Sequence, residues 1–121
     1  MSAKSIQVRF IHPVEIRMGS PYCVCKVSLS GAWVPELPSR DEDFQNLEAW
    51  STDGNCLALV QWRISQQNDP GFRILTIAIK ERQLKKSRRI RGCCHSLSWE
   101  DGAFKYDVVA FQDGSFKRKT C

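Results

Sequence analysis

Residues 49–60, AWSTDGNCLALV, and residues 97–106, LSWEDGAFKY, contain the pattern that decides the fold. In each stretch the end of one apolar segment leads through an Asp-Gly pair into the start of the next. Glycine adopts positive φ without a Cβ clash, and aspartate tolerates the same tight geometry, so Asp-Gly between such segments signals a hairpin. The two stretches therefore predict two antiparallel hairpins, whose tryptophans, Trp50 and Trp99, are 99 − 50 = 49 residues apart.

The segments that flank these hairpins also have strand patterns. Apolar and polar residues alternate in the first half of the chain, and nearly continuous apolar runs follow in the second half. In residues 57–64 the even positions (Ala58, Val60, Trp62 and Ile64) are the expected core face, and Trp62→Ala is expected to cost most of the domain's stability. Pro13 interrupts the first alternating segment, which favours a sheet edge or a bulge there. The expected strands are 6–10, 14–18, 22–29, 57–64, 72–79, 87–90 and 104–111, with a reversal at 83–86.

One segment favours a helix. Ser39 followed by Glu42 has the form of a capping box, in which each side chain bonds the other residue's backbone N–H. Phe44 and Leu47 then fall on one helical face, which predicts a short helix over about residues 40–48. The prediction for the whole chain is a single all-β domain over residues 1–121. It is an antiparallel meander forming a blade-like sheet, a small sandwich or a barrel, with at most one short helix.

The local order of these elements resembles a known repeat. The stretch Trp-x-x-Asp-Gly-x-x-Leu-Ala-Leu-Val at 50–60, followed by a strand, a basic hairpin and the second Asp-Gly stretch, resembles β-propeller blades of the TolB and WD-repeat kind. The resemblance covers roughly residues 47–111 and implies a strand order rather than a function. Propellers close with several blades and this chain holds little more than two. The resemblance therefore implies either a blade-like meander in a small domain or an assembly of several chains.

Composition excludes several other classes of protein. Hydrophobic residues make up 42 % of the 121 residues and charged residues 26 %, which is the balance of a folded domain. The longest apolar run, 56–60, is too short to span a bilayer, and no signal peptide is recognisable at the N-terminus. We expect a cytoplasmic protein without a membrane partner.

The charges separate into an acidic and a basic segment. Residues 36–53 contain six acids against one arginine, whereas residues 80–91, called the basic segment below, contain seven cations against Glu81 alone. Clustered cations favour phosphates or acidic proteins, but they are also an ordinary protection of a sheet edge. The expected contact residues are Lys80, Arg82, Lys85, Lys86, Arg88, Arg89 and Arg91, with Trp33 as a possible exposed anchor or, equally, a lid on the core.

The six cysteines are expected to be reduced in a cytoplasmic protein. Cys23, Cys25, Cys93 and His95 would offer three thiols and an imidazole to zinc if their strands adjoined. Their spacing is not that of zinc knuckles, so core cysteines and no metal or other cofactor are the expectation.

No catalytic motif is present. The chain lacks a Gly-x-Ser-x-Gly elbow, a phosphate-binding glycine loop and a His-Glu-x-x-His sequence. His12 and His95 are expected to be structural, and Asp53 and Asp101 are explained by their turns. The leading hypothesis is a non-enzymatic interaction or regulatory module that binds an acidic protein or its own copies. The alternative is a nucleic-acid-binding protein that uses the basic segment and the tail 117–119.

Overall fold

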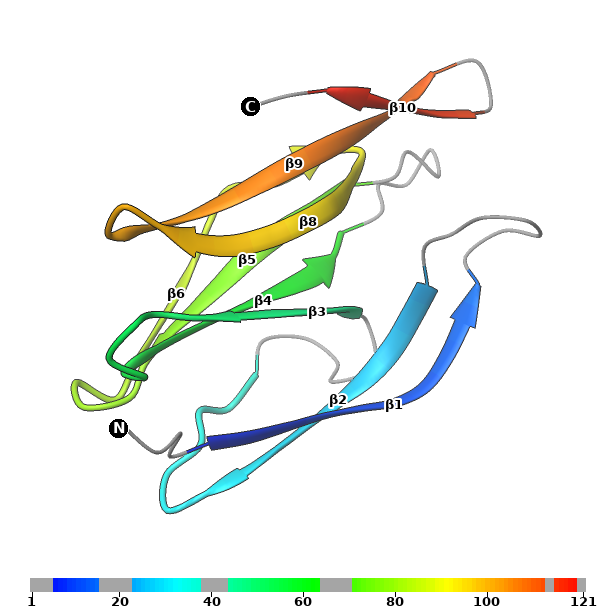
Figure 1. Ribbon diagram of the computed structural model, residues 1–121. Helices are drawn as coiled ribbons and strands as arrows, with labels where there is room; N and C mark the ends of the chain where they lie inside the picture. The colour runs from blue at the N-terminus through cyan, green and yellow to red at the C-terminus, as the bar shows by residue number, and fades with distance from the viewer. Residues whose placement is uncertain (1–5, 16–22, 38–43, 64–70, 113–114, 120–121) are drawn as a thin grey trace.

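In the computed structural model, which describes residues 6–15, 23–37, 44–63, 71–112 and 115–119, every regular element of those ranges is a β-strand (Figure 1). The all-β prediction is therefore confirmed. The strands are β1 (Ile6–Glu15), β2 (Cys23–Gly31), β3 (Phe44–Trp50), β4 (Cys56–Trp62), β5 (Gly71–Ala78), β6 (Gln83–Lys86), β7 (Ile90–Arg91), β8 (Cys93–Glu100), β9 (Ala103–Gln112) and β10 (Ser115–Lys119).

The strands form two antiparallel sheets whose order follows the sequence. The larger sheet runs β1-β2-β3-β4-β5-β6, with β7 pairing beside β6 on β5, and the smaller sheet runs β10-β9-β8. Both Asp-Gly predictions hold. Asp101 and Gly102 adopt φ values of 52° and 76° and join β8 to β9 in a two-residue turn, and Gly54 adopts 75° between β3 and β4.

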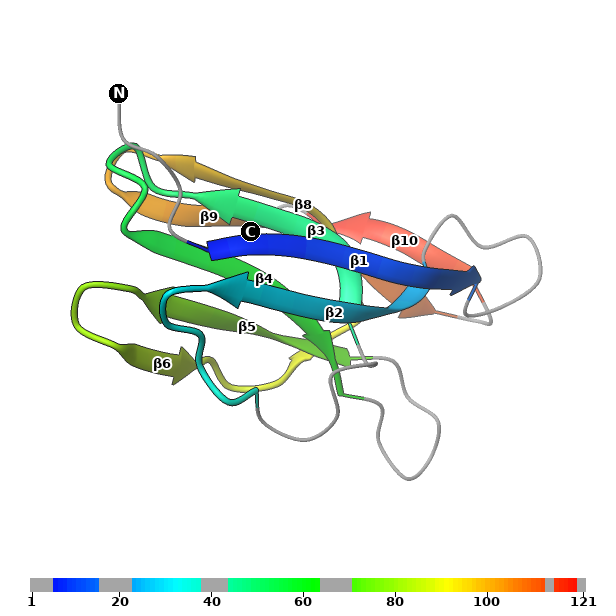
Figure 2. The ribbon, with the colours of Figure 1, turned by 90° about the horizontal axis from the view of Figure 1, so that it is seen from below.

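The sheets pack in three layers (Figures 1 and 2). Among the described residues β2 pairs with β3 only at Cys25 and Phe44, so the β1–β2 hairpin lies against one face of the strands β3–β6. The β8–β9 hairpin covers the other face. Of the predicted alternatives, the structure has the packed-sheet arrangement of a sandwich. We call the two layers of packing the first core cluster (Ile6, Cys25, Val27, Phe44, Leu57, Leu59, Leu75 and Ile77) and the second core cluster (Ala58, Val60, Phe72, Ile74, Cys94 and Val108).

Strand β4 is buried on both faces. Its residues from Leu57 to Trp62 are all buried, with odd positions such as Leu59 in the first core cluster and even positions such as Val60 in the second. The predicted burial of Trp62 is confirmed, because only 4 % of it is exposed. The assignment of a core face to the even positions alone is wrong, because a second layer covers the odd positions.

The predicted helix over 40–48 is wrong from Phe44 onward, because these residues form β3; residues 40–43 lie outside the described ranges. Antiparallel pairing with β4 overrides the local capping signal. Alternation along β3 places Phe44 in the first core cluster and Leu47, three residues further on, against the second. The pairing register with β4 shifts between Phe44 and Glu48 without changing this facing.

The basic segment is also arranged differently from its prediction. Residues 83–86 form β6 rather than a reversal, and the chain reverses over residues 79–82 instead. Of the strand predicted over 87–90, only Ile90 belongs to a strand, the two-residue β7. The apolar pattern predicted a strand to residue 79 and β5 ends at Ala78, so its end was predicted to within one residue, but no local signal marked the turn that follows.

The pairing registers of β1 and β8 are each interrupted once. The register of β1 shifts between Ile11 and Val14 on the terminal strand of the sheet, which confirms the edge or bulge expected at Pro13. In the sequence, the alternation of residues 93–99 predicts one shared face for Cys93, His95, Leu97 and Trp99. This prediction is wrong, because the register of β8 shifts between Cys94 and Ser96. Cys94, not Cys93, shares the second core cluster with Leu97, and His95 is exposed.

A buried glutamine joins two layers through hydrogen bonds. Gln45 on β3 is 2 % exposed, its Nε2 donates to the Cys94 carbonyl at 2.8 Å, and its Oε1 accepts from the Cys94 backbone N–H at 3.0 Å. The carboxamide thus pairs with β8 as a neighbouring strand would. It satisfies two main-chain groups close to the bulge in β8.

We expect Gln45→Ala to lower the free energy of unfolding by about 2–3 kcal/mol, because both Cys94 main-chain groups lose their partner in a buried site. Chemical denaturation measures the loss. The control is Gln83→Ala, an exposed amide whose removal should change stability by less than about 0.5 kcal/mol. Equal effects of the two substitutions would show that the bridge does not hold the layers together.

Candidate functional site

The basic segment occupies one end of the larger sheet. Strand β6 is terminal there, and all seven cations of the segment are exposed, whereas Leu84 and Ile90 pack toward the two core clusters. Lys85 lies opposite Thr76, and Lys86 lies opposite Leu75 of the first core cluster. Because opposite residues of an antiparallel pair share a face, the two lysines lie on opposite faces of the sheet edge.

The turn that precedes β6 is fixed by hydrogen bonds to Asn55, which lies in the β3–β4 turn. Its backbone carbonyl accepts from the Ile79 N–H and its Oδ1 accepts from the Lys80 N–H, each at 2.9 Å. Its Nδ2 donates to Glu81 Oε1, also at 2.9 Å. Glu81, the only acid of the basic segment, is therefore bonded to the β3–β4 turn.

Arg82 completes this turn in a strained conformation. Its φ is 51°, in the left-handed region, and its N–H donates to the Ile79 carbonyl at 3.1 Å. Glycine is the usual residue at such a position, because a Cβ there clashes with the backbone. A non-glycine residue persists in this region only where its surroundings impose it, as the Asn55 bonds do here.

A second group of arginines lies at the far end of β5. Arg89 Nε donates to the Arg63 carbonyl at 2.7 Å, and the Arg89 guanidinium lies so close to Gly71 that a Cβ there would meet it at 2.5 Å. Arg73 Nε donates to the buried Gln61 Oε1 at 2.8 Å. Burial, together with the charge of Arg63, lowers the pKa of Arg73.

One of the expected contact residues, Arg89, also has a structural role. Its guanidinium bonds the Arg63 carbonyl and lies against Gly71, and the sequence did not reveal these contacts. Arg63, Arg73 and Gln61 were not recognised in the sequence, because their contacts depend on the pairing of β4 with β5.

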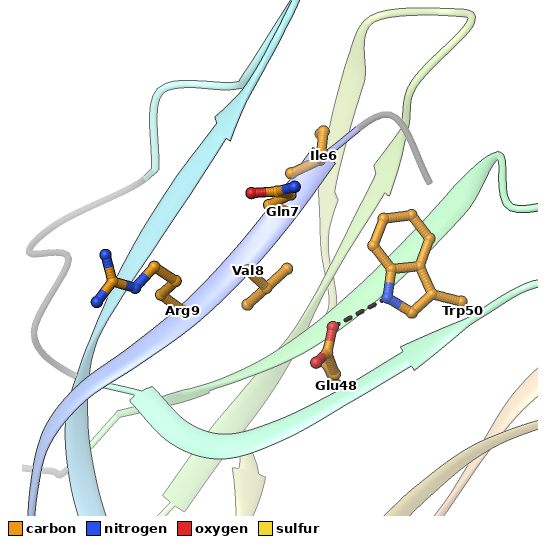
Figure 3. A pocket seen from close by; sticks show the side chains of 6 residues that line it. All are labelled: Ile6, Gln7, Val8, Arg9, Glu48 and Trp50. Atoms are coloured by element: carbon orange, nitrogen blue, oxygen red, sulfur yellow. Dashed lines mark hydrogen bonds between the residues drawn. The ribbon is translucent and has the colours of Figure 1, made fainter. Parts of the chain in front are cut away.

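An open groove of about 410 Å³ lies between β1 and β3 (Figure 3). It is lined by Ile6, Gln7, Val8, Arg9, Glu48 and Trp50, and Trp50 Nε1 donates to Glu48 Oε2 at 2.9 Å. Figure 3 shows Val8 on the side of β1 that faces Glu48 and Trp50, with Arg9 pointing to the other side. The only carboxylate among its lining residues is thus oriented by an indole rather than by a proton-transfer partner. The sequence gave no signal for this groove, because its walls are far apart along the chain.

The structure describes several of the other residues singled out in the sequence, and these lie at separate places in the fold. Within the described ranges no group of three or more His, Cys, Asp or Glu residues is placed to hold a metal ion. Cys25 lies in the first core cluster, whereas Cys93 packs with Trp62 and Val109 in a separate, third cluster. The side chain of Cys23 lies outside the described part. Cys25, Cys56, Cys93 and Cys94 are in the thiol form, and the Cys25 and Cys94 thiols donate to the carbonyls of Phe44 and Ser96.

Trp33 is half-buried and packs against the first core cluster, which is the lid-like placement. Asp101 lies in its hairpin turn, as its sequence context predicted. The tail 117–119 lies in β10, antiparallel to β9.

Asp53 is likewise explained by its turn. Its Oδ1 accepts from the Ser51 hydroxyl at 2.7 Å and from the Asn55 backbone N–H at 3.0 Å, and these bonds lower its pKa below the ordinary value. Because the folded pKa is lowered, the contribution to stability is complete above the ordinary pKa of the carboxyl group. It is lost as pH falls through the folded value.

Comparisons of the chain with family models, curated proteins and solved structures found no match. The resemblance of residues 47–111 to propeller blades therefore stays a prediction. Across the part of the chain that the structure describes, no helix has the length and apolar character needed to cross a membrane.

We expect Arg82→Gly to raise the free energy of unfolding by about 0.5–1 kcal/mol, because glycine relieves the left-handed strain. The control is Arg82→Ala, which removes the same charge and keeps the Cβ. Denaturation midpoints measure both variants. If alanine stabilises the fold as much as glycine, relief of charge repulsion rather than of strain is the cause.

We expect Ser51→Ala to raise the pKa of Asp53 toward the ordinary aspartate value, because the largest stabilisation of its carboxylate is removed. An NMR titration of the aspartate side chains measures this shift, with the exposed Thr52→Ala as the control. An unchanged Asp53 pKa in Ser51→Ala would contradict the hydrogen bond seen in the turn.

Proposed function

We propose that this chain is a non-enzymatic interaction domain that binds an acidic protein partner through the basic segment. The observation that carries the proposal is the exposure of all seven cations, which lie on β6, on β7, and in the turn and connection next to β6. The only acid in the segment, Glu81, is bonded to Asn55. A concentrated field of one sign attracts an oppositely charged partner and raises its rate of encounter.

Two features support a protein rather than a nucleic acid as the partner. Single-strand binders stack bases on aromatic side chains, and the basic segment contains no aromatic residue. Val34 is the only large hydrophobic residue classed as exposed among those described, so no exposed aromatic platform stands beside the cations. An acidic protein needs no such platform.

A non-enzymatic role is supported by the positions of the carboxylates that could act in acid–base catalysis, because each has a structural role instead. Asp53 and Asp101 lie in turns, and Glu48 is oriented by the indole of Trp50. General acid–base catalysis needs proton donors and acceptors gathered around one reacting position. The described carboxylates are instead distributed over separate turns and strands.

We expect the triple variant Lys85→Ser, Lys86→Ser, Arg88→Ser to bind polyglutamate about tenfold more weakly than the parent protein, since exposed ion pairs contribute about 0.2–1 kcal/mol each. These three side chains are exposed, so the fold should be retained. The matched control removes three exposed cations from other strands: Arg9→Ser, Lys26→Ser and Lys105→Ser. Fluorescence anisotropy at roughly 50 and 200 mM salt measures all three proteins.

Equal losses in the two triple variants would show that net charge, not the basic segment, attracts the polyanion, and the proposal would be wrong. Duplex DNA of random sequence serves as the competing ligand. If the parent binds DNA much more tightly than polyglutamate and the basic-segment variant loses that binding, the partner is a nucleic acid and the proposed class of partner is wrong.

A further inference from the structure

Successive residues of β6 direct their main-chain N–H and C=O groups alternately toward β5 and away from it. The Ser87 backbone N–H donates to the Ile74 carbonyl at 2.9 Å, and the β5–β6 register continues that pairing with Thr76 opposite Lys85 and Ala78 opposite Gln83. In an antiparallel ladder the hydrogen-bonded pairs alternate with pairs whose main-chain groups point away. The N–H and C=O groups of Leu84 and Lys86 therefore point away from β5, toward the outer edge of the sheet.

This outer edge combines main-chain and charged groups. No strand of the described chain pairs with it, because β6 ends the order of the larger sheet. Lys85 and Lys86 lie on its two faces, as their opposite residues on β5 show, and exposed Arg88 follows them. A strand added here would have one lysine on each face of the sheet at the Lys85–Lys86 end of β6.

We propose that an extended acidic segment of a partner protein adds to the larger sheet as a strand beside β6. Its main chain pairs with Leu84 and Lys86, and its carboxylates lie beside Lys85 and Lys86. This mode of binding rests on the proposed function and specifies its geometry. Strand addition obtains affinity from main-chain hydrogen bonds and specificity from side chains on the two faces.

The charges of β6 select the incoming strand. Opposite charges across an antiparallel pair are favourable and like charges are unfavourable, so two β6 edges from two copies would repel each other. Nucleic acid can reach the same lysines but cannot pair with the main chain of Leu84 and Lys86. An acidic polypeptide is the one class of partner that uses both kinds of group.

The neighbouring turn orders the start of β6 in the absence of a partner. Asn55 bonds the backbone of Ile79 and Lys80 and the side chain of Glu81, and Arg82 is kept in its left-handed conformation. The start of β6 is thus fixed by contacts that are independent of any partner. A strand that is already ordered loses less conformational entropy on binding.

A pair of peptides tests the geometry. In the first, pairs of glutamates alternate with pairs of threonines, so that both faces of the added strand carry glutamates, and the peptide extends one residue beyond β6 at each end. The second has the same sequence with N-methyl groups on the amides that face β6. Both have the same charge, but only the first can donate main-chain hydrogen bonds. We expect the methylated peptide to bind about tenfold more weakly, since each net hydrogen bond contributes about 0.5–1.5 kcal/mol.

A matched pair of protein variants tests the same main-chain hydrogen bonds by changing β6 instead of the peptide. Lys86→Pro and Lys86→Ser remove the same charge, but only proline removes the outward N–H. Proline is tolerated on an edge strand where its nitrogen faces solvent. We expect Lys86→Pro to bind the unmethylated peptide at least about threefold more weakly than Lys86→Ser. If thermal unfolding shows that Lys86→Pro does not fold, the two peptides with the parent protein decide the question.

The outcomes separate this inference from the proposed function. Equal binding of the two peptides, or binding of polyglutamate without binding of either peptide, would overturn strand addition and leave the proposed function standing. If polyglutamate and both peptides fail to bind, the proposed function and strand addition fail together.

Discussion

The structure depends on the burial of β4 on both of its faces. Residues from Leu57 to Trp62 all lie in the core, and one layer of strands cannot bury both sets of side chains. The β1–β2 hairpin covers the odd positions and the β8–β9 hairpin covers the even ones. Burial of apolar area, at about 25 cal/mol per Å², is the main force that holds such layers together. The three-layer order therefore follows from one nearly continuous apolar strand.

Polar side chains fix how the layers meet. Gln45 bonds the β8 main chain, so the hairpin that covers the even positions is joined to β3 by directional contacts as well as by packing. Within the larger sheet, Asn55 joins the β3–β4 turn to the β5–β6 turn by hydrogen bonds. The larger sheet ends at β1 on one side and at β6 on the other, and β6 is the terminal strand that carries two adjacent exposed lysines. Stability and the proposed binding surface thus come from the same arrangement of strands.

Local chemistry explains which parts of this structure could be predicted from the sequence. The Asp101-Gly102 turn depends only on neighbouring residues, so it was predicted correctly. The strand at Phe44 depends on pairing with Gln61, seventeen positions away (61 − 44 = 17), and a local capping pattern gave a helix instead. The two-residue turn and the buried Trp62 needed no knowledge of distant partners, but the second covered face of β4 did.

The candidate site likewise has features that neighbouring residues reveal and features that depend on residues distant along the chain. The basic segment was recognisable from composition, because clustered cations are visible in any sequence. The contact of Arg89 with the Arg63 carbonyl, the bulge at His95 and the groove beside Trp50 each require residues that are distant along the chain. The alternation of inward and outward groups along β6 requires the register with β5.

Native-state hydrogen exchange tests the arrangement of β4 most directly. Because both faces of β4 are covered, the amides of Leu57 to Gln61 should be among the slowest in the chain and should exchange only on global unfolding. On β6, the amides of Gln83 and Lys85 should exchange more slowly than those of Leu84 and Lys86. If the β4 amides exchange as fast as the outward amides of β6, the strand is not enclosed between two layers and the account is wrong.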